Sequence, residues 1–155
     1  MKFEIKHKLT KPERIGILRL WNSEYPKQLV HENLESLELY LASLKNAEHV
    51  VVKDTLKNVH GWLVRFERDE ANWFAIIISR AHQSIGVGSQ LMELLPRDET
   101  IFGWVLTDPN HIMADGENYK LPYDFYHKLG FQMEERITLS KDGINSVRIV
   151  RAATI

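Results

Sequence analysis

The sequence contains no cysteine, and that absence excludes three kinds of chemistry. Disulfide bonds, thiolate zinc sites and cysteine nucleophiles all need a thiol. Long apolar runs are absent too, since no stretch approaches the roughly 18 residues that suggest a membrane-spanning helix. Segment 1–8 carries charge at nearly every second position and lacks the apolar core of a signal peptide. We therefore expect a cytoplasmic protein without a membrane partner.

The chain also lacks an excess of either charge, because 20 basic and 21 acidic side chains give a formal net charge of −1. Such a balance creates no global field that would attract nucleic acid, so we expect no nucleic-acid partner. The hydrophobic share of 44% and the charged share of 26% are ordinary for a globular protein. A length of 155 residues predicts a single domain, 1–155, with its own core.

The first part of the chain is predicted to form a strand and two helices. Apolar residues alternate with charged ones over 3–9, which is typical of a strand with one buried face. Segment 10–13 matches a capping box with proline in the first helical turn, and this helix should end before Pro26. A stripe of apolar residues at helical spacing predicts the second helix. The stripe consists of Val30, Leu34, Leu37, Leu41 and Leu44.

The middle of the chain predicts three strands in an antiparallel meander, over 49–53, 59–67 and 73–78. In the second strand, Trp62 shares a face with other apolar residues, which favours a core position for it. Three consecutive isoleucines close the third strand, so we expect that strand to be buried on both faces and central in the sheet.

A helix and a further strand then complete a βαβ unit. The helix should run from the glycines at 86 and 88 to Pro96, which stops it. One face of it carries Val87, Leu91, Leu94 and Leu95. The strand that follows, 101–106, should lie parallel to 73–78, because a helical crossover joins parallel strands.

The C-terminal part is predicted to contain a loop, a short helix and a hairpin. Segment 107–120 shows no periodicity, and irregular segments of that length are often functional. Pro122 opens a helix that ends at Leu129, with Gly130 in the position after the cap. An Asp-Gly pair at 142–143 predicts a tight turn between the last two strands.

Segment 79–95 is a candidate phosphate site, because it joins a buried strand to the start of a helix. The first amides of a helix have no intrahelical partner and lie at the positive end of its dipole, where a phosphate or pyrophosphate binds well. Gly86 and Gly88 would let the backbone approach such a ligand. The lysine of a nucleotide-binding P-loop is absent, which argues against Mg-nucleotide chemistry.

Two motifs resemble those of the GNAT superfamily of N-acetyltransferases. Gln83-Ser-Ile-Gly86-Val-Gly88 is similar to the family's Gln/Arg-x-x-Gly-x-Gly/Ala signature. Phe125-Tyr126-His127-Lys128-Leu129-Gly130-Phe131 is similar to its Phe-Tyr-x-Lys-Leu-Gly-Phe segment. The order of the predicted elements also matches. The resemblance implies an α/β fold with a mixed, mostly antiparallel sheet of seven strands, about four helices and one parallel pair that splays apart at the cofactor site.

The resemblance further implies that acetyl-CoA is the co-substrate, with no metal. Its pyrophosphate would lie on the backbone of 83–89, and its pantetheine arm would bond the backbone at positions 78 and 80. The implied cofactor-binding residues are Ile78, Arg80, Gln83, Ser84, Ile85, Gly86, Val87, Gly88 and Ser89. Tyr126 matches the tyrosine that protonates the departing CoA thiolate, a step for which a phenol is a suitable donor. Tyr119 stands where the family often has an asparagine.

The residue that takes the proton of the amine is not indicated by the sequence. The strand before the glycines has no carboxylate, whereas several family members carry a glutamate there. Substitutes occur nearby, and water or an amine that arrives neutral would need none of them. These candidates are His82, His111, Asp108, Asp115 and Glu117.

The function that the resemblance implies is direct transfer of an acetyl group to a primary amine in a ternary complex, since no cysteine can hold the acetyl group. The alternative is a non-catalytic acyl-CoA sensor or regulatory module, which the missing strand carboxylate keeps open. The amine, whether a small molecule or a peptide, is not identified. Trp62, Trp104 and Tyr123 could line its pocket or belong to the core. The expected edge strands make a homodimer plausible.

Overall fold

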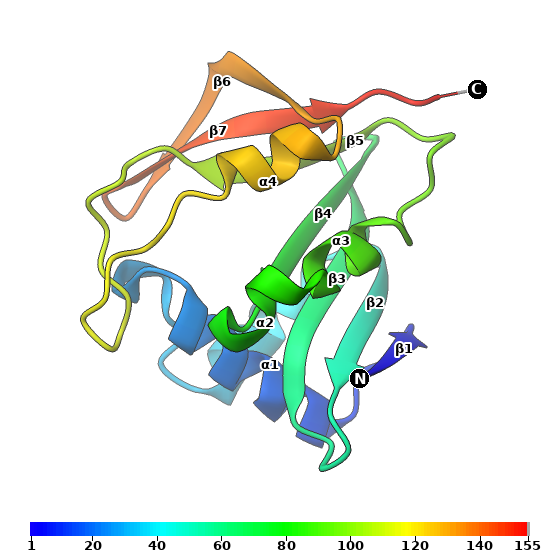
Figure 1. Ribbon diagram of the computed structural model, residues 1–155, viewed down its shortest axis with the longest axis vertical. Coiled ribbons are helices and arrows are strands. Elements are labelled where there is room, and N and C mark those ends of the chain that lie inside the picture. The colour runs from blue at the N-terminus through cyan, green and yellow to red at the C-terminus, as the bar shows by residue number, and fades with distance from the viewer. Residues whose placement is uncertain (155) are drawn as a thin grey trace.

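The computed structural model describes residues 1–154 and contains one seven-stranded sheet with helices on both faces (Figure 1). The strand order is β1-β2-β3-β4-β5-β7-β6, and only the pair β4–β5 is parallel. The strands are β1 (Lys2–Lys6), β2 (Lys45–Lys53), β3 (Val59–Arg68), β4 (Ala71–Ile78), β5 (Ile101–Leu106), β6 (Gln132–Lys141) and β7 (Ile144–Arg151). The predicted mixed, mostly antiparallel sheet is confirmed.

Four α-helices and two short 3₁₀-helices connect these strands. The α-helices are α1 (Lys11–Glu24), α2 (Leu34–Ala42), α3 (Val87–Met92) and α4 (Tyr123–Lys128). The 3₁₀-helices are η1 (Lys27–Leu29) and η2 (Arg80–Ile85). Within residues 1–154, no helix is both long and apolar enough to cross a membrane.

The predicted start of α1 is confirmed in detail. The Thr10 side chain accepts a hydrogen bond from the Glu13 amide at 3.3 Å, and the Glu13 carboxylate accepts one from the Thr10 amide at 2.7 Å. Two of the amides that helix geometry leaves unpaired are thereby satisfied. The helix ends at Glu24, before Pro26, as predicted.

The prediction that Val30 belongs to the stripe of α2 is wrong. Asn33 caps this helix by accepting the Ser36 amide at 2.9 Å, so the helix begins only at Leu34. Val30 has an extended backbone after η1 and is 37% exposed. The start of α2 is therefore set by the N-cap residue Asn33 rather than by the spacing of the apolar residues.

Each face of the sheet is covered by a different pair of helices (Figure 1). On one face, α1 and α2 bury a cluster that includes Trp62, Trp73 and Ile77. On the other face, α3 and α4 bury a cluster that includes Phe74 and Ile78. Adjacent residues of β4 thus point to opposite cores, and the prediction that this strand is central is confirmed.

The parallel pair β4–β5 stays together only at its beginning. Asn72 pairs with Ile101 and Trp73 with Phe102, and beyond these two positions the strands no longer pair. Strand β5 instead pairs with β7 over its whole length. Residues 74–78 of β4, here called the diverging segment, therefore have no strand partner on the β5 side. This confirms the splayed pair that the resemblance implied.

Candidate active site

The backbone of the diverging segment faces the space that β5 leaves open. The Ser79 amide donates to the His60 carbonyl of β3 at 2.9 Å. Because backbone groups alternate sides along a strand, those of Ile78 point away from β3, toward β5. The Ile78 carbonyl accepts a hydrogen bond from the Gln83 side chain at 3.0 Å. The structure thus brings together two of the predicted cofactor residues, Ile78 and Gln83.

The segment after β4 differs in two respects from the predicted glycine-bearing turn and helix up to Pro96. A 3₁₀-helix, η2, comes first and ends at Gly86, which has a φ of +87°. Helix α3 then begins at Val87 and ends at Met92, well before Pro96, and Leu94 is 48% exposed rather than buried. The chain therefore turns sharply at Gly86, which directs the start of α3 toward the end of β4.

The amides at the start of α3 lie in the segment where the sequence analysis expects a phosphate cradle. The Gln90 amide makes the first helical bond, to the Gly86 carbonyl at 3.0 Å. The amides of Val87, Gly88 and Ser89 precede it and have no intrahelical acceptor. These amides and the helix dipole together favour an anion such as a pyrophosphate.

The two glycines of this turn serve different purposes. A Cβ atom on Gly86 would meet nothing within 4 Å, so this position borders open space that a ligand can use. A Cβ atom on Gly88 would lie 3.0 Å from the Phe125 ring of α4. Gly88 is therefore required for the packing of α3 against α4, which the sequence reasoning did not foresee.

Tyr126 of α4 lies beside the diverging segment of β4. Its ring is 5.8 Å from that of Phe74 in an edge-on arrangement, and the residue is only 8% exposed. Burial, with a smaller contribution from nearby Tyr119, raises the pKa of Tyr126 well above its ordinary value. The phenol therefore keeps its proton at neutral pH, as a proton donor must.

Arg80 follows β4 directly and is bound by three carboxylates. Its amide and its Nε atom donate to Glu24, at 2.6 and 3.2 Å. Its Nη1 atom lies 2.7 Å from oxygens of both Asp115 and Glu117. The Arg80 amide, Nε and Nη1 groups are thus all engaged by carboxylates.

Glu24 is a site residue that the sequence reasoning missed. Its side chain is only 7% exposed and lies at the end of α1, where the helix dipole disfavours a negative charge. The sequence did contain one indication of this role. An acidic residue at the end of a helix needs a nearby cation, and the last turn of α1 has none.

The 107–120 loop closes the end of the sheet at which β4 and β5 diverge. It leaves β5, reaches Arg80 through Asp115 and Glu117, and contacts the segment after α1. There the Lys27 amide donates to the Ile112 carbonyl at 2.9 Å, and Pro26 forms a bridge with Met113. Contacts to Arg80 and to the segment after α1 thus hold this irregular segment in place.

The candidate proton acceptors differ in how firmly they are engaged. Asp115 and Glu117 are paired with Arg80, and the His82 ring bonds the Ser79 hydroxyl at 2.7 Å. His111 is 6% exposed, and its Nε2 atom is buried with no hydrogen-bond partner within residues 1–154. The nearest carboxylate oxygen to that atom belongs to Asp108, at 3.8 Å. Among these candidates, His111 is thus the one whose side chain has the fewest hydrogen-bond partners.

The three aromatic residues considered for an acceptor pocket lie in different environments. Trp62 is fully buried and donates to His49 at 3.0 Å, so its predicted core position is confirmed. Trp104 packs against the same core cluster, where it stacks on Trp73 at 5.5 Å between centroids. Only Tyr123 is exposed, at 38%, and its ring stacks on that of His127.

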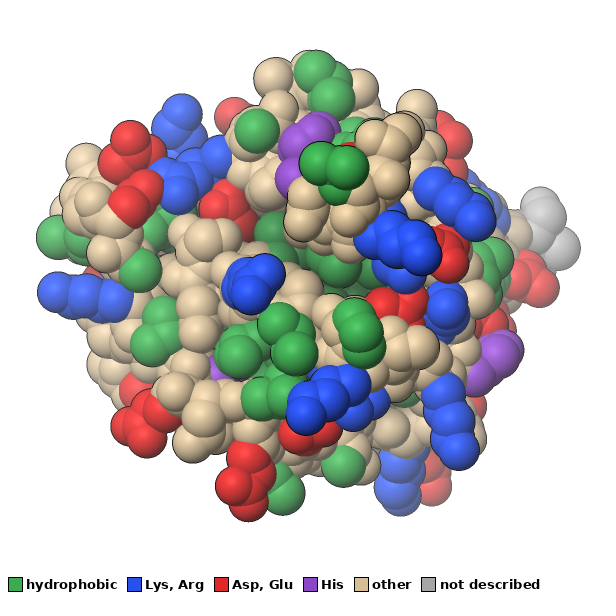
Figure 2. Space-filling model, turned by 90° about the horizontal axis from the view of Figure 1, so that it is seen from below, with side chains coloured by type: hydrophobic (Ala, Val, Ile, Leu, Met, Phe, Trp, Pro, Cys, Tyr) green, Lys and Arg blue, Asp and Glu red, His purple; other side chains and the backbone are tan. Residues whose placement is uncertain are grey.

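Charges of both signs are intermixed on the face of the molecule that Figure 2 shows. Acidic and basic side chains alternate there, and a group of hydrophobic side chains lies near the middle of the view. This face therefore presents no extended patch of one sign, in line with a net charge of −1.

Comparison with solved structures identifies the fold, although no family model and no curated protein matches the sequence. The chain has the fold of the GNAT N-acetyltransferases, as the two motifs predicted. An aminoglycoside 6′-N-acetyltransferase complexed with coenzyme A is 13% identical, with 97% of this chain and 96% of that chain covered and a TM-score of 0.69. An acyl-CoA N-acyltransferase from Pseudomonas aeruginosa is 16% identical, with coverage of 97% and 99% and a TM-score of 0.64. A spermidine/spermine N-acetyltransferase from Vibrio cholerae is 18% identical, with coverage of 96% and 91% and a TM-score of 0.57.

Proposed function

We propose that this protein is an N-acetyltransferase that transfers an acetyl group from acetyl-CoA to a primary amine. The divergence of β4 from β5 after only two paired positions carries the proposal. Because of this divergence, the backbone of Ile78 does not pair with β5. The segment that follows Ile78 leads to the free amides at the start of α3. An extended acyl-CoA arm and its pyrophosphate need these two features in this order. A neighbour in fold with coenzyme A bound supports the same reading.

The residues that would hold acetyl-CoA fit its chemistry. The pyrophosphate would accept hydrogen bonds from the backbone of 83–89, foremost from the amides of Val87 to Ser89 at the start of α3. The open space beside Gly86 would admit it. The pantetheine amides would bond the backbone of Ile78, as a strand partner would.

The proposed reaction is direct transfer between two bound substrates. The amine nitrogen attacks the acetyl carbonyl carbon, a C–N bond forms, and the C–S bond breaks as the thiolate leaves. Tyr126 donates its proton to that thiolate, because its phenol is protonated at neutral pH and lies beside β4. His111 takes the proton of the amine, since its buried ring is the least engaged candidate base on the loop that closes the site.

The charges around Arg80 favour a cationic acceptor. Glu24, Asp115 and Glu117 bring three carboxylates to one guanidinium, so the group carries surplus negative charge at the end of β4. An amine substrate is a cation before it loses its proton, and such a group attracts it. The named substrates of the neighbours, an aminoglycoside and spermidine or spermine, are amines, which supports this class without selecting a member.

Two measurements in sequence test the proposal. Calorimetric titration with acetyl-CoA should show binding in the micromolar range, and no binding at millimolar ligand would exclude the function. Release of free CoA thiol is then followed with a panel of polyamines, aminoglycosides, amino acids and peptides. Thiol release that depends on one class of amine supports the enzyme. Binding without release by any amine would instead support the alternative, a non-catalytic acyl-CoA sensor.

A further inference from the structure

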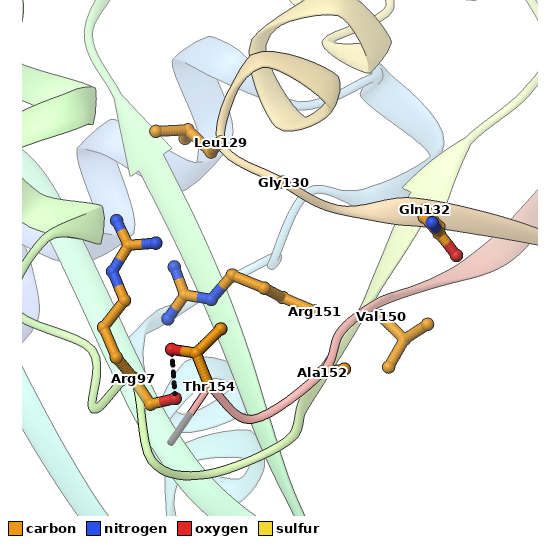
Figure 3. A pocket seen from close by; sticks show the side chains of 8 residues that line it. All are labelled: Arg97, Leu129, Gly130, Gln132, Val150, Arg151, Ala152 and Thr154. Atoms are coloured by element: carbon orange, nitrogen blue, oxygen red, sulfur yellow. Dashed lines mark hydrogen bonds between the residues drawn. The ribbon is translucent and has the colours of Figure 1, made fainter.

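A hollow of about 310 Å³ lies beside the end of β7, next to the start of β5 (Figure 3). Its walls come from the segment before β5, the end of α4, the start of β6 and the end of β7. The lining residues are Arg97, Leu129, Gly130, Gln132, Val150, Arg151, Ala152 and Thr154. The lining contains two arginines and no acidic side chain.

Arg151 is a buried cation without a counter-ion in the described part of the chain. The residue is only 5% exposed, and its Nη1 atom is buried with no hydrogen-bond partner. Its Nη2 atom has only a long contact of 3.5 Å, to the Pro96 carbonyl. Across residues 1–154, no carboxylate lies within 4.0 Å of this guanidinium. A buried charge without a partner is costly, so such an atom points to a ligand.

Arg97 brings a second guanidinium to the same hollow. Figure 3 shows the two side chains extending into it with their guanidinium groups side by side. Burial lowers the pKa of Arg151, and the positive charge of Arg97 lowers it further. Two like charges in one hollow repel each other, and an anion between them would remove that repulsion.

Contacts around the hollow fix the backbone of Arg97 and the side chain of Arg151. The Arg97 carbonyl accepts hydrogen bonds from the Thr154 amide at 2.7 Å and from its hydroxyl at 3.2 Å. The Phe131 ring lies 5.4 Å from the Arg151 guanidinium, and Gly130 lies beside the aliphatic part of that side chain. The buried side chain of Arg151 is therefore held in position before any ligand arrives.

The hollow is distant from the proposed acetyl-CoA cradle. Ile101 pairs with Arg151 on one side and with Asn72, near the start of β4, on the other. The cradle follows Ile78 at the opposite end of β4, about 20 Å away at the usual rise of a strand. A ligand in the hollow would thus bind independently of the proposed reaction.

We propose that this hollow is an oxyanion site that binds a phosphate group, separate from the acetyl-CoA cradle. Arginine forks match the oxygens of phosphate with paired N–H donors, and here one fork is buried and the other lies at the rim. The Thr154 hydroxyl adds a neutral polar group to the lining. The inference does not rest on the proposed function, since phosphate binding can be measured without any amine.

Calorimetric titration of the full chain with inorganic phosphate at low salt tests this site. The unaltered chain should bind with millimolar or tighter affinity, while Arg151→Gln and Arg97→Gln should each weaken binding at least about tenfold. Arg148→Gln is the matched control, because Arg148 lies on the same strand but pairs with Glu134, and it should leave phosphate affinity unchanged. If Arg151→Gln fails to fold, the exposed Arg97 still provides the test.

Three results would overturn the proposal. The first is no phosphate binding by the unaltered chain, and the second is equal binding by the Arg97→Gln variant. The third is displacement of phosphate by CoA. Saturating CoA should leave the phosphate affinity unchanged, and displacement of phosphate by CoA would show that the two sites are not separate.

Discussion

Arg80 and Glu24 are joined by two hydrogen bonds, although 56 residues separate them in the sequence. The Glu24 carboxylate accepts both the backbone amide and the Nε–H of Arg80. The pair connects the end of α1 to the end of β4, and Arg80 extends the connection to the 107–120 loop through Asp115 and Glu117. The acceptor side of the site thus depends on a buried carboxylate from a distant helix.

Replacement of Glu24 by alanine should destabilise the protein by about 1–3 kcal/mol, because it leaves the Arg80 amide without its acceptor. Glu24→Gln keeps an oxygen for that amide and should cost less. Urea unfolding of both variants measures the difference. If Glu24→Ala is as stable as the unaltered chain, this connection does not hold the site together.

The sequence could not predict this connection, because local patterns do not say which surfaces meet. Periodicity placed α1, β4 and the 107–120 loop correctly as separate elements. The contacts of Arg80 join all three, and they depend on tertiary packing rather than on spacing. The same limit explains Gly88, whose packing against Phe125 depends on a helix far along the chain.

What the sequence did predict rests on strong local chemistry. The capping box at Thr10 and the glycine after α4, with its φ of +89°, are features in which a few adjacent residues decide the structure. The errors occur where two local preferences compete. Asn33 caps α2 and so excludes Val30 from that helix, and the helix after the glycines ends at Met92 instead of continuing to Pro96.

Gly86→Val should abolish acetyl-CoA binding, since the added side chain would fill the open space beside the α3 amides. Titration with acetyl-CoA measures the loss. The substitution also strains a backbone with a φ of +87°, so a control is needed for that effect. Gly143→Val has a similar φ of +77° and open surroundings in the β6–β7 turn, far from the cradle, and should leave the affinity unchanged. Equal losses in both variants would contradict the proposed cradle.

Tyr126→Phe should lower the turnover number about 10²-fold while acetyl-CoA affinity stays nearly the same, because only the proton donor is removed. The phenylalanine preserves the edge-on contact with Phe74, so the fold should be unaffected. Steady-state kinetics with an accepted amine, together with calorimetry, separates the two quantities. An unchanged turnover number would remove Tyr126 from the mechanism.

His111→Gln should reduce the turnover number about 10²-fold at neutral pH, if its ring takes the proton of the amine. The deficit should shrink as pH rises, because a larger fraction of the amine is then already neutral. The pH profile of the turnover number tests both parts. Asp115→Asn is the control on the same loop, since its carboxylate pairs with Arg80, and it should not produce this pH-dependent recovery. A deficit that is the same at every pH would indicate a structural role for His111.

His49 should make the fold less stable in mild acid. Its buried ring accepts a hydrogen bond from Trp62, and burial lowers the pKa of His49 from 6.5 to about 4, against a smaller opposing effect of Glu13. Because the folded pKa is the lower one, the unfolded chain binds the proton first. The stabilisation is therefore complete above pH 6.5 and is lost as the pH falls toward 4, at up to about 1.4 kcal/mol per pH unit.

The His49→Gln variant isolates this effect from other titrations. A glutamine oxygen can still accept the Trp62 N–H, but it does not bind a proton in this range. Urea unfolding at a series of pH values should therefore give a shallower acid slope for His49→Gln than for the unaltered chain. Burial raises the pKa of Glu13, but hydrogen bonds from Lys53, Thr10 and Lys6 lower it to about 2. Glu13 therefore affects the stability at lower pH, and equally in both chains. Identical slopes between pH 6.5 and 4 would show that His49 does not titrate as its burial requires.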